Sequence, residues 1–502
     1  MKHSKFLFQI LIICQLSSYS YGQGIHSRTN STEEKLSYFL KLADSIRVAA
    51  KLPGVGIAIV YDQEIIHTGG LGYRNLERKL PVDANTLFSI GSNTKGFTGV
   101  LAAQLVDQGL MDWYEPLISY LPELKLKDAH ITENVNMADA LRHGTGLGSH
   151  DEVWKFKSLS REELLAQMHD LDFVGRFRTS YIYNNLMYTV VGMAQEKASG
   201  KSWESLIETE ILEPLEMSDS YTHFEEFMAS DQRAIGYRED GLTEEISVDI
   251  TSVAPAGAIS STPKDIAKWL LMLLNEGKHK GKEFMSKAAH DYVMMPGQNV
   301  GFRAPNEFWY YNAGIGGYYK EGKRSLGHNG GIEGQNSRMV LKPDEGFGIF
   351  IMTNQISGYK ELMTEYAEKI FLQNDYRRNP LAEQALQNNQ SFAHFQIILD
   401  LEGVDAARDF YMGMNKEGLE ASMNALAYVF MGNGEMEKAA FLFEQNILTY
   451  PNSANAFDSY GEYFFVLKNY EDALTNYEKS LELDPKNTNA DMMIQKIKDL
   501  RP

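Results

Sequence analysis

The spacing of hydrophobic and polar positions predicts two hairpins that lie far apart along the chain. Residues 54–60 form a continuous apolar run and residues 64–68 a second one, with the polar residues 61–63 between them. Short apolar runs that flank a polar turn are typical of paired strands. The same arrangement recurs with residues 337–341 and 346–351, so a second hairpin is expected there.

Apolar residues follow helical intervals between the two hairpins, for example over residues 94–108 and 263–275. Amphipathic helices bury one face, and a sheet built from strands at both ends of a segment supplies a surface for it. This order of elements predicts an α/β domain with a helical insertion, which we place at residues 33–372.

Beyond residue 380 the pattern is helical only, and it repeats after 34 residues, as Pro451 and Pro485 illustrate. The same offset relates small and large apolar positions, including Ala439 and Ala473, Phe443 and Tyr477, and Phe430 and Phe464. This period and pattern resemble the tetratricopeptide repeat (TPR). We expect a linker at residues 373–390 and an all-α, TPR-like solenoid at 391–502, with an unrelated helical bundle as the alternative.

Residues 1–22 have the features of a cleavable signal peptide. A basic start precedes an apolar run at residues 6–14, and Ser20 and Gly22 supply small residues before the expected cleavage point. The run is too short to span a bilayer. We therefore expect an exported protein, periplasmic or extracellular, with no transmembrane segment in the mature chain. Lipid attachment at Cys14 is disfavoured because Ile13 stands where a small residue is needed.

Charge and cysteine content narrow the classes of function. The 48 Lys and Arg residues against 67 Asp and Glu give a formal charge of −19, which disfavours a nucleic-acid partner. The single cysteine, Cys14, lies in the expected signal peptide, so a disulfide framework or a cysteine-rich metal site is excluded. Any nucleophile in the mature chain has to be a different side chain.

A Ser-x-x-Lys motif, Ser92 to Lys95, stands at the start of the predicted helix of residues 94–108. Residues three apart at a helix start lie on one face, so the lysine can reach the serine hydroxyl. A desolvated lysine can accept the proton of a hydroxyl, and the N-terminus of a helix stabilises a developing negative charge. Taken alone, this short motif is more often an N-capping serine followed by a surface lysine.

Two further motifs supply polar groups that suit a substrate site. Tyr183 and Asn185 stand two apart, and on an extended segment both would face one cleft. His328 is followed by Gly330 and Gly331, which let the backbone approach a ligand closely. A capped helix start and a glycine turn are the structural alternatives for these two motifs.

Taken in order, the three motifs resemble the penicillin-recognising serine hydrolases, and most closely the class C β-lactamase group with its D-aminopeptidase and esterase relatives. Other stretches that match the recurrent pattern of this family are residues 53–56, 86–92, 141–147 with 150–151, and 254–262. The resemblance covers residues 35–372. It implies a β-lactamase/transpeptidase-like fold, in which an antiparallel sheet is flanked by helices and joined by a helical subdomain.

The resemblance also implies the roles of the motif residues. Ser92 would be acylated, and Lys95 and Tyr183 would share proton transfer, with Tyr183 also activating water for deacylation. Asn185 would bind substrate and hold Lys95. The N–H groups of Ser92 and Gly331 would form the oxyanion hole, beside Gly330.

His328 departs from the family pattern, which usually has Lys-Thr-Gly at this place. A side chain that titrates near pH ~6.5 then replaces a permanent cation. The change disfavours a β-lactam and favours a peptide, amide or ester substrate. If His328 has to be protonated to bind a carboxylate, KM is expected to rise between about pH 6 and 8.

No cofactor is implied, and the family loop explains His143, His150 and Asp151 without a metal. The main hypothesis is therefore an exported serine hydrolase for small molecules or peptides, with weak β-lactamase activity as a side reaction. The alternative is a catalytically idle, penicillin-binding-like scaffold whose TPR-like tail binds a protein or peptide partner.

Overall fold

The computed structural model describes residues 31–155, 157, 159–238, 244, 247–304 and 307–373, and in the tail 392, 395, 398, 399, 403–414, 416, 418–432 and 434–500. The predicted signal peptide and all but the first residue of the predicted linker lie outside the described residues. Within the described residues, no helix combines the length and the apolar character that crossing a membrane requires.

A nine-stranded antiparallel sheet forms the centre of the first domain, in the order β3-β2-β1-β13-β12-β11-β10-β9-β8. The two predicted hairpins are confirmed and pair with each other, because Val55 of β1 lies opposite Thr353 of β13. The strands are β1 (Gly54–Tyr61), β2 (Glu64–Asn75), β3 (Leu80–Pro81), β8 (Gln298–Ala304), β9 (Glu307–Asn312), β10 (Ile315–Lys320), β11 (Lys323–Ile332), β12 (Gln335–Lys342) and β13 (Phe347–Thr353).

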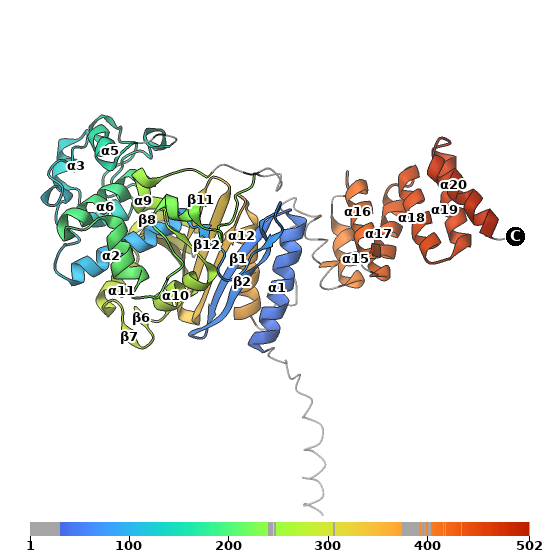
Figure 1. Cartoon of the computed structure of the whole chain (residues 1–502), viewed down its shortest axis with the longest axis horizontal. Coiled ribbons are helices and arrows are strands. Elements are labelled where there is room, and N and C mark those ends of the chain that lie inside the picture. Colours follow the sequence, from blue (N-terminus) through green and yellow to red (C-terminus); the bar gives the residue numbers. More distant parts are fainter. Residues whose placement is uncertain are drawn as a thin grey trace, which may run out of the picture.

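The apolar run of β1 is continuous because helices cover both faces of the sheet at its centre. Ile57 and Ile59 pack towards α1 (Thr32–Ala49) and α12 (Tyr359–Leu372), which lie side by side in Figure 1. Ala58 and Val60 point the other way, into a second core that includes α10 (Pro263–Leu274). Successive side chains of a strand face opposite sides, so such a strand is apolar at every position.

The helical subdomain lies on the α10 side, away from α1 (Figure 1). Its centre is α2 (Thr94–Asp107), whose residues from Thr94 to Leu105 are all buried. The remaining elements are α3 (Ala129–Asn134), α4 (Met137–Leu141), α5 (Arg161–Gln167), α6 (Asn185–Ser199), α7 (Trp203–Ile207), α8 (Phe224–Ala229), α9 (Ala254–Gly257) and α11 (Lys287–Met294), with the short pairs β4 (Phe88–Ser89) with β5 (Ser260–Ser261) and β6 (Lys278–His279) with β7 (Lys282–Glu283).

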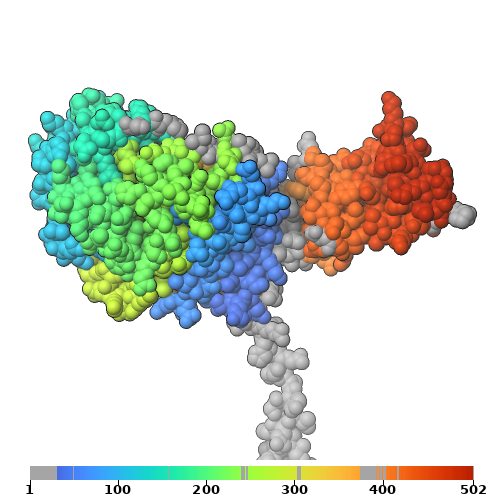
Figure 2. All heavy atoms as spheres, viewed as in Figure 1, coloured from blue at the N-terminus to red at the C-terminus, as the bar shows by residue number. Residues whose placement is uncertain are grey.

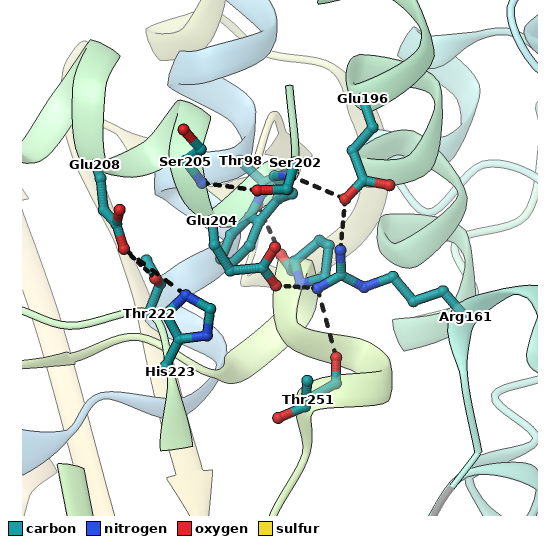
Figure 3. A network of polar contacts seen from close by, with 12 residues as sticks. Thr98, Arg161, Glu196, Ser202, Glu204, Ser205, Glu208, Thr222, His223 and Thr251 are labelled. Carbon is teal, nitrogen blue, oxygen red and sulfur yellow. Dashed lines mark hydrogen bonds and ion pairs between the residues drawn. The ribbon is translucent and has the colours of Figure 1, made fainter. Parts of the chain in front are cut away.

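Arg161 of α5 ties three helices to the segment that leads into α9 (Figure 3). Its guanidinium contacts the carboxylates of Glu196 on α6 and Glu204 on α7, and it donates to the Thr251 carbonyl. The Arg161 side chain is 12% exposed, so these are largely buried ion pairs. They fix residues 251–257 against the helical subdomain.

Between residues 404 and 500 the described part of the tail consists of helices joined by short connections, and Figure 2 shows it as a separate lobe. The helices are α15 (Val404–Gly413), α16 (Glu420–Gly432), α17 (Met436–Thr449), α18 (Ala454–Val466), α19 (Tyr470–Leu483) and α20 (Thr488–Leu500). Because α16, α18 and α20 begin at residues 420, 454 and 488, successive units are 34 residues apart. This arrangement fits a TPR-like tail.

Candidate active site

Ser92 lies in a short 3-10 turn, Gly91–Asn93, that leads directly into α2. Two glycines let β11 pack tightly against this turn. A Cβ on Gly91 would lie 2.6 Å from the Gly331 nitrogen, and a Cβ on Gly330 would lie 1.9 Å from the Ile90 carbonyl oxygen. The Ser92 turn and the Gly331 backbone are therefore neighbours.

Lys95 is fully buried in the first turn of α2, and its amine meets three oxygen atoms. Nζ lies 2.7 Å from Asn185 Oδ1, 2.8 Å from the Ala256 carbonyl and 3.2 Å from Ser92 Oγ. Burial holds the pKa of Lys95 well below its usual range, and the Asp151 carboxylate partly opposes this effect.

Burial favours the neutral amine, and the three oxygens can satisfy that form as well. A neutral amine has two N–H donors and one lone pair, and the oxygens of Asn185 and Ala256 can only accept. Those two acceptors take the N–H groups of Lys95, so the lone pair of the neutral form is left for the Ser92 hydroxyl. The Ser92 hydroxyl then donates to Lys95.

Tyr183 lies on the other side of the serine, where its side chain is hydrogen-bonded to Ser92. The Lys95 amine is 4.8 Å from the centroid of the Tyr183 ring, and the His143 ring packs 4.3 Å away between centroids. Burial raises the pKa of Tyr183, and the contact with the Ser92 side chain acts in the opposite sense. The phenol is therefore protonated at neutral pH.

Asn185 reaches the same amine from a different kind of element than the sequence predicts. Residue 184 caps α6, its side chain accepting from the Met187 N–H, and Asn185 is the first residue of the helix rather than part of an extended segment. The Asn185 amide donates to Asp151 Oδ1 at 3.0 Å. This second bond orients the amide, so that its oxygen faces Lys95.

Asp151 is the residue that sequence reasoning missed. The sequence pattern places Asp151 only in a recurrent loop, yet its Oδ1 accepts from both Asn185 and the Trp154 indole, each at 3.0 Å. Its position one residue after His150 in the recurrent family loop was the only available signal, because the contact with Asn185 joins positions 34 apart.

His328 lies within β11, not in a glycine turn, and it is partly buried behind Tyr183 and Tyr311. Nδ1 faces the Asn329 carbonyl at 2.5 Å, which can only accept, so Nδ1 carries the proton. Nε2 then accepts from the Tyr311 hydroxyl at 2.8 Å. Burial, with the nearby Lys95, lowers the pKa of His328 to about 3.

This geometry corrects the expected titration of His328 near pH 6.5. The imidazole is neutral at physiological pH and both ring nitrogens have protein partners. A role for His328 in binding substrate stays a prediction, but a role as a cation at neutral pH does not fit the structure.

A cleft of 290 Å³ opens beside Ser92 between the helical subdomain and the sheet. Its polar wall comprises Asp151, Lys155, Asn185 and Glu333, and its apolar wall comprises Trp154, Ile250, Val253, Ile332 and Ile356. Gly331 also lines it, whereas Tyr183 and His328 line a neighbouring aromatic pocket of 310 Å³. The structure thus places Ser92, Tyr183 and Asn185 around the Lys95 amine. His328 lies farther away, in the neighbouring aromatic pocket.

The histidines and Asp151 of the family loop do not converge on a common point. His143 Nδ1 accepts from the Asn184 N–H at 3.1 Å, while the His150 ring contacts Glu152 and the Asp172 carbonyl. In the part of the chain that the structure describes, no three His, Cys, Asp or Glu side chains are grouped as metal ligands.

Comparison with known proteins gives a family match over most of the first domain. The model of the family described as Beta-lactamase matches residues 41–369. A similar curated protein is the unguisins hydrolase ungD of Aspergillus violaceofuscus, 28% identical over 335 residues, which are 61% of this chain and 58% of that protein. The chain therefore spans less than two thirds of the length of that relative.

Two further matches are more distant. Protein flp of Staphylococcus aureus is 23% identical over 346 residues, 67% of this chain and 66% of that protein. Among solved structures, the octameric penicillin-binding protein homologue from Pyrococcus abyssi aligns with a TM-score of 0.60 and 24% identity, over 71% of this chain and 82% of the other. At that identity the structural match concerns the fold alone.

Proposed function

The chain belongs to the Beta-lactamase family, and from this premise we propose that it is an exported serine hydrolase that cleaves a small peptide, amide or ester through an acyl-enzyme on Ser92. The observation that supports this most is the surroundings of the Lys95 amine. Two carbonyl oxygens occupy its N–H groups, so its lone pair faces Ser92 Oγ at 3.2 Å. A buried lysine arranged in this way is a base for the serine.

In the acylation step, Ser92 Oγ attacks the substrate carbonyl and Lys95 accepts the hydroxyl proton. The N–H groups of Ser92 and Gly331 stabilise the oxyanion, because both belong to backbone at the edge of the cleft. When the tetrahedral intermediate collapses, the bond to the leaving nitrogen or oxygen breaks. The proton held by Lys95 passes to that atom, with Tyr183 sharing the transfer.

In the deacylation step, a water molecule attacks the acyl carbon and the Ser92 ester bond breaks. Tyr183 is protonated at neutral pH because burial raises its pKa, so it acts by passing a proton and not as a phenolate. The proton leaves the water through the Tyr183 hydroxyl and returns to Ser92 Oγ. Lys95 is neutral again after the cycle.

The substrate is proposed as a small peptide, amide or ester, including substrates that contain D-amino acids, with weak β-lactamase activity at most. The curated relative whose name is unguisins hydrolase supports hydrolysis as the reaction class. A neutral His328 does not supply the permanent cation that would hold a β-lactam carboxylate. No cofactor is proposed.

The direct test is labelling and turnover of the purified protein. A fluorophosphonate probe should label the wild type on Ser92, and Ser92→Ala should abolish both labelling and hydrolysis of p-nitrophenyl esters while the circular dichroism spectrum stays unchanged. Thr94→Ser, a neighbouring hydroxyl change in the same helix, serves as the control. Full activity of Ser92→Ala would exclude the proposal.

The tail is proposed as a TPR-like module over residues 391–502 that binds a protein or peptide partner. The 34-residue spacing of α16, α18 and α20 supports it. If the alternative holds, in which the first domain is an idle scaffold, the fluorophosphonate probe leaves Ser92 unlabelled while the tail still captures its partner. Removing residues 381–502 separates the two activities: unchanged ester hydrolysis with loss of the partner identifies the tail as the docking part.

A further inference from the structure

The cleft beside Ser92 has a net negative charge that its own residues do not neutralise. Three charged side chains line it, namely Asp151, Lys155 and Glu333. Lys155 Nζ lies 3.1 Å from Glu333 Oε1, so these two opposite charges form a pair. Asp151 is left as the unbalanced charge, since burial favours the neutral form of Lys95 behind it.

One oxygen of the Asp151 carboxylate, Oδ2, has no hydrogen-bond donor among the described residues. Oδ1 accepts the two N–H groups from Asn185 and Trp154, both of which are neutral. Within the described residues, Oδ2 has no hydrogen-bond donor and the carboxylate has no ion-pair partner. A carboxylate bound only by neutral donors keeps its full charge, and a cation is the ligand that it binds best.

Asp151 is also close to the reacting groups. A single side chain, Asn185, separates its Oδ1 from the Lys95 amine, with hydrogen bonds of 3.0 and 2.7 Å on either side. The α-amino group of an amino-acid amide or ester is two bonds away from the carbonyl carbon that Ser92 attacks. A substrate whose carbonyl carbon lies at Ser92 can therefore hold that amine in the same cleft as Asp151.

We propose that Asp151 binds the free ammonium group of the substrate, so that the enzyme selects amino-acid amides and esters, or peptides, with an unblocked amine next to the scissile carbonyl. This proposal rests on the proposed function and adds the substrate class. It also gives a reason for the neutral histidine, because selection by an amine does not require a cation at His328. Among the described residues that line the cleft, the cation that could bind a substrate carboxylate is Lys155, and it is paired with Glu333.

A purely structural role for Asp151, holding Asn185 and Lys95 in place, predicts a different pattern. If Asp151 had only that role, its substitution would slow the hydrolysis of every substrate by the same factor. Recognition of an amine instead changes the ratio between a free-amine substrate and its N-acetyl form, because both report on the same serine, lysine and tyrosine.

The experiment compares kcat/KM for D- and L-alanine p-nitroanilide with their N-acetyl forms in full-length protein. The wild type should favour the free amine at least tenfold in one enantiomer. Asp151→Asn keeps the size and an acceptor oxygen for Asn185, and it should reduce that ratio at least tenfold. Glu333→Gln is the matched control, since it removes one negative charge from the same cleft but should leave the ratio within about twofold. An equal loss in both variants would show a general charge effect and overturn the proposal.

A second measurement needs no variant. The ratio in the wild type should fall above about pH 8, where an α-amino group loses its proton. Ser92, Lys95 and Tyr183 act on both substrates, and Lys155 and Glu333 line the same cleft for both, so the pH dependence of the catalytic groups cancels in the ratio. A ratio near one, or a ratio that is constant from pH 6 to 10, would overturn the amine site.

The two proposals fail separately. If p-nitrophenyl acetate is hydrolysed in a Ser92-dependent manner but the amine ratio is near one, only the amine site is wrong. If nothing is hydrolysed, aminomethylboronic acid and its N-acetyl form are compared as ligands of Ser92. Equal affinity would overturn the amine site, and absence of binding by both would remove it together with the proposed function.

Discussion

The amide oxygen of Asn185 lies 2.7 Å from the Lys95 amine, and the amide nitrogen of the same side chain donates to Asp151. A buried amine and a carboxylate in the cleft are thus linked through one amide. Through this link the charge of Asp151 influences Lys95, the proposed base. The same carboxylate also lines the cleft.

The first prediction concerns the pH profile of activity. Lys95 has to be neutral to act as a base, and burial lowers its pKa, so kcat/KM for p-nitrophenyl acetate should rise with pH on a limb centred well below 10.5. Asp151→Asn removes the charge that opposes this shift and should move the limb to lower pH. A neutral ester is used because its own protonation does not change.

Glu333→Gln is the control for that experiment. The Glu333 carboxylate is paired with Lys155, and it is not among the groups that shift the pKa of Lys95. A limb that moves to higher pH in Asp151→Asn, or that stays at the position of a free lysine in the wild type, would contradict the assignment of Lys95 as the base.

The second prediction concerns His328 and the affinity for substrate. Because the pKa of His328 is lowered to about 3, its charge does not change between pH 6 and 8. KM for an N-acetylated ester should therefore be constant within about twofold over that range. This outcome is the opposite of the expectation from sequence alone. A clear increase in KM that disappears in His328→Gln would contradict this prediction, because it would mean that His328 binds substrate in its charged form.

The third prediction concerns stability in mild acid. Burial lowers the pKa of both His143 and His328 in the folded state, whereas unfolded histidines titrate near 6.5. Above pH 6.5 both states are neutral. Below it, the unfolded chain binds protons that the folded chain does not, so stability falls as the pH falls, by about 1.4 kcal/mol per pH unit for each histidine that stays neutral in the fold.

Urea denaturation at pH 6.5, 5.5 and 5.0 measures this slope, and the range stays above the titration of most carboxylates. His328→Gln should have a shallower slope than the wild type, by up to about 1.4 kcal/mol per pH unit. The difference between the two proteins cancels the contributions of the other histidines. Equal slopes would mean that His328 is already protonated in the fold.

Local patterns predicted the strands at the two ends of the first domain's sequence, and long-range contacts explain what they missed. The hairpins of β1 with β2 and of β12 with β13 are visible because their apolar runs are continuous. The region of β8 to β11 was not predicted, since glycines such as Gly316 and Gly317 have low strand propensity. There a Cβ on Gly317 would lie 2.4 Å from the Ser325 carbonyl, so the glycine is required by the neighbouring strand.

The candidate site shows the same division. The order of motifs identified Ser92, Lys95 and Tyr183 as a group, because these residues recur together in a known family. Neither the protonation state of His328 nor the bond between Asp151 and Asn185 has a sequence signal. Both depend on burial and on side chains that folding brings together, Tyr311 in one case and Trp154 in the other.

The fourth prediction compares two adjacent glycines of β11. A Cβ at position 330 would lie 1.9 Å from the Ile90 carbonyl oxygen and 2.3 Å from Ser337 Oγ, whereas at position 331 its nearest contact is 4.0 Å away. Gly330→Ala should destabilise the fold by about 1–3 kcal/mol or more, as overpacking does. Gly331→Ala should keep the melting temperature and lower kcat, since its methyl group enters the cleft beside Ser92. Equal melting temperatures would contradict the tight packing of β11 against the serine turn.

The last prediction concerns Arg161, which acts on the cleft from a distance. Its removal leaves the carboxylates of Glu196 and Glu204 partly buried without a cation, and it releases the Thr251 carbonyl (Figure 3). Arg161→Met should cost about 3–5 kcal/mol, the usual penalty for breaking a buried ion pair on one side. Because Ile250 and Val253 flank Thr251 and line the cleft, KM should also increase more than kcat decreases.

Lys201→Met is the matched control, since Lys201 pairs with Glu210 at 3.3 Å but is 50% exposed, and it should cost less than about 1 kcal/mol. Equal effects of the two substitutions on urea unfolding would show that the Arg161 cluster does not hold the cleft wall in place.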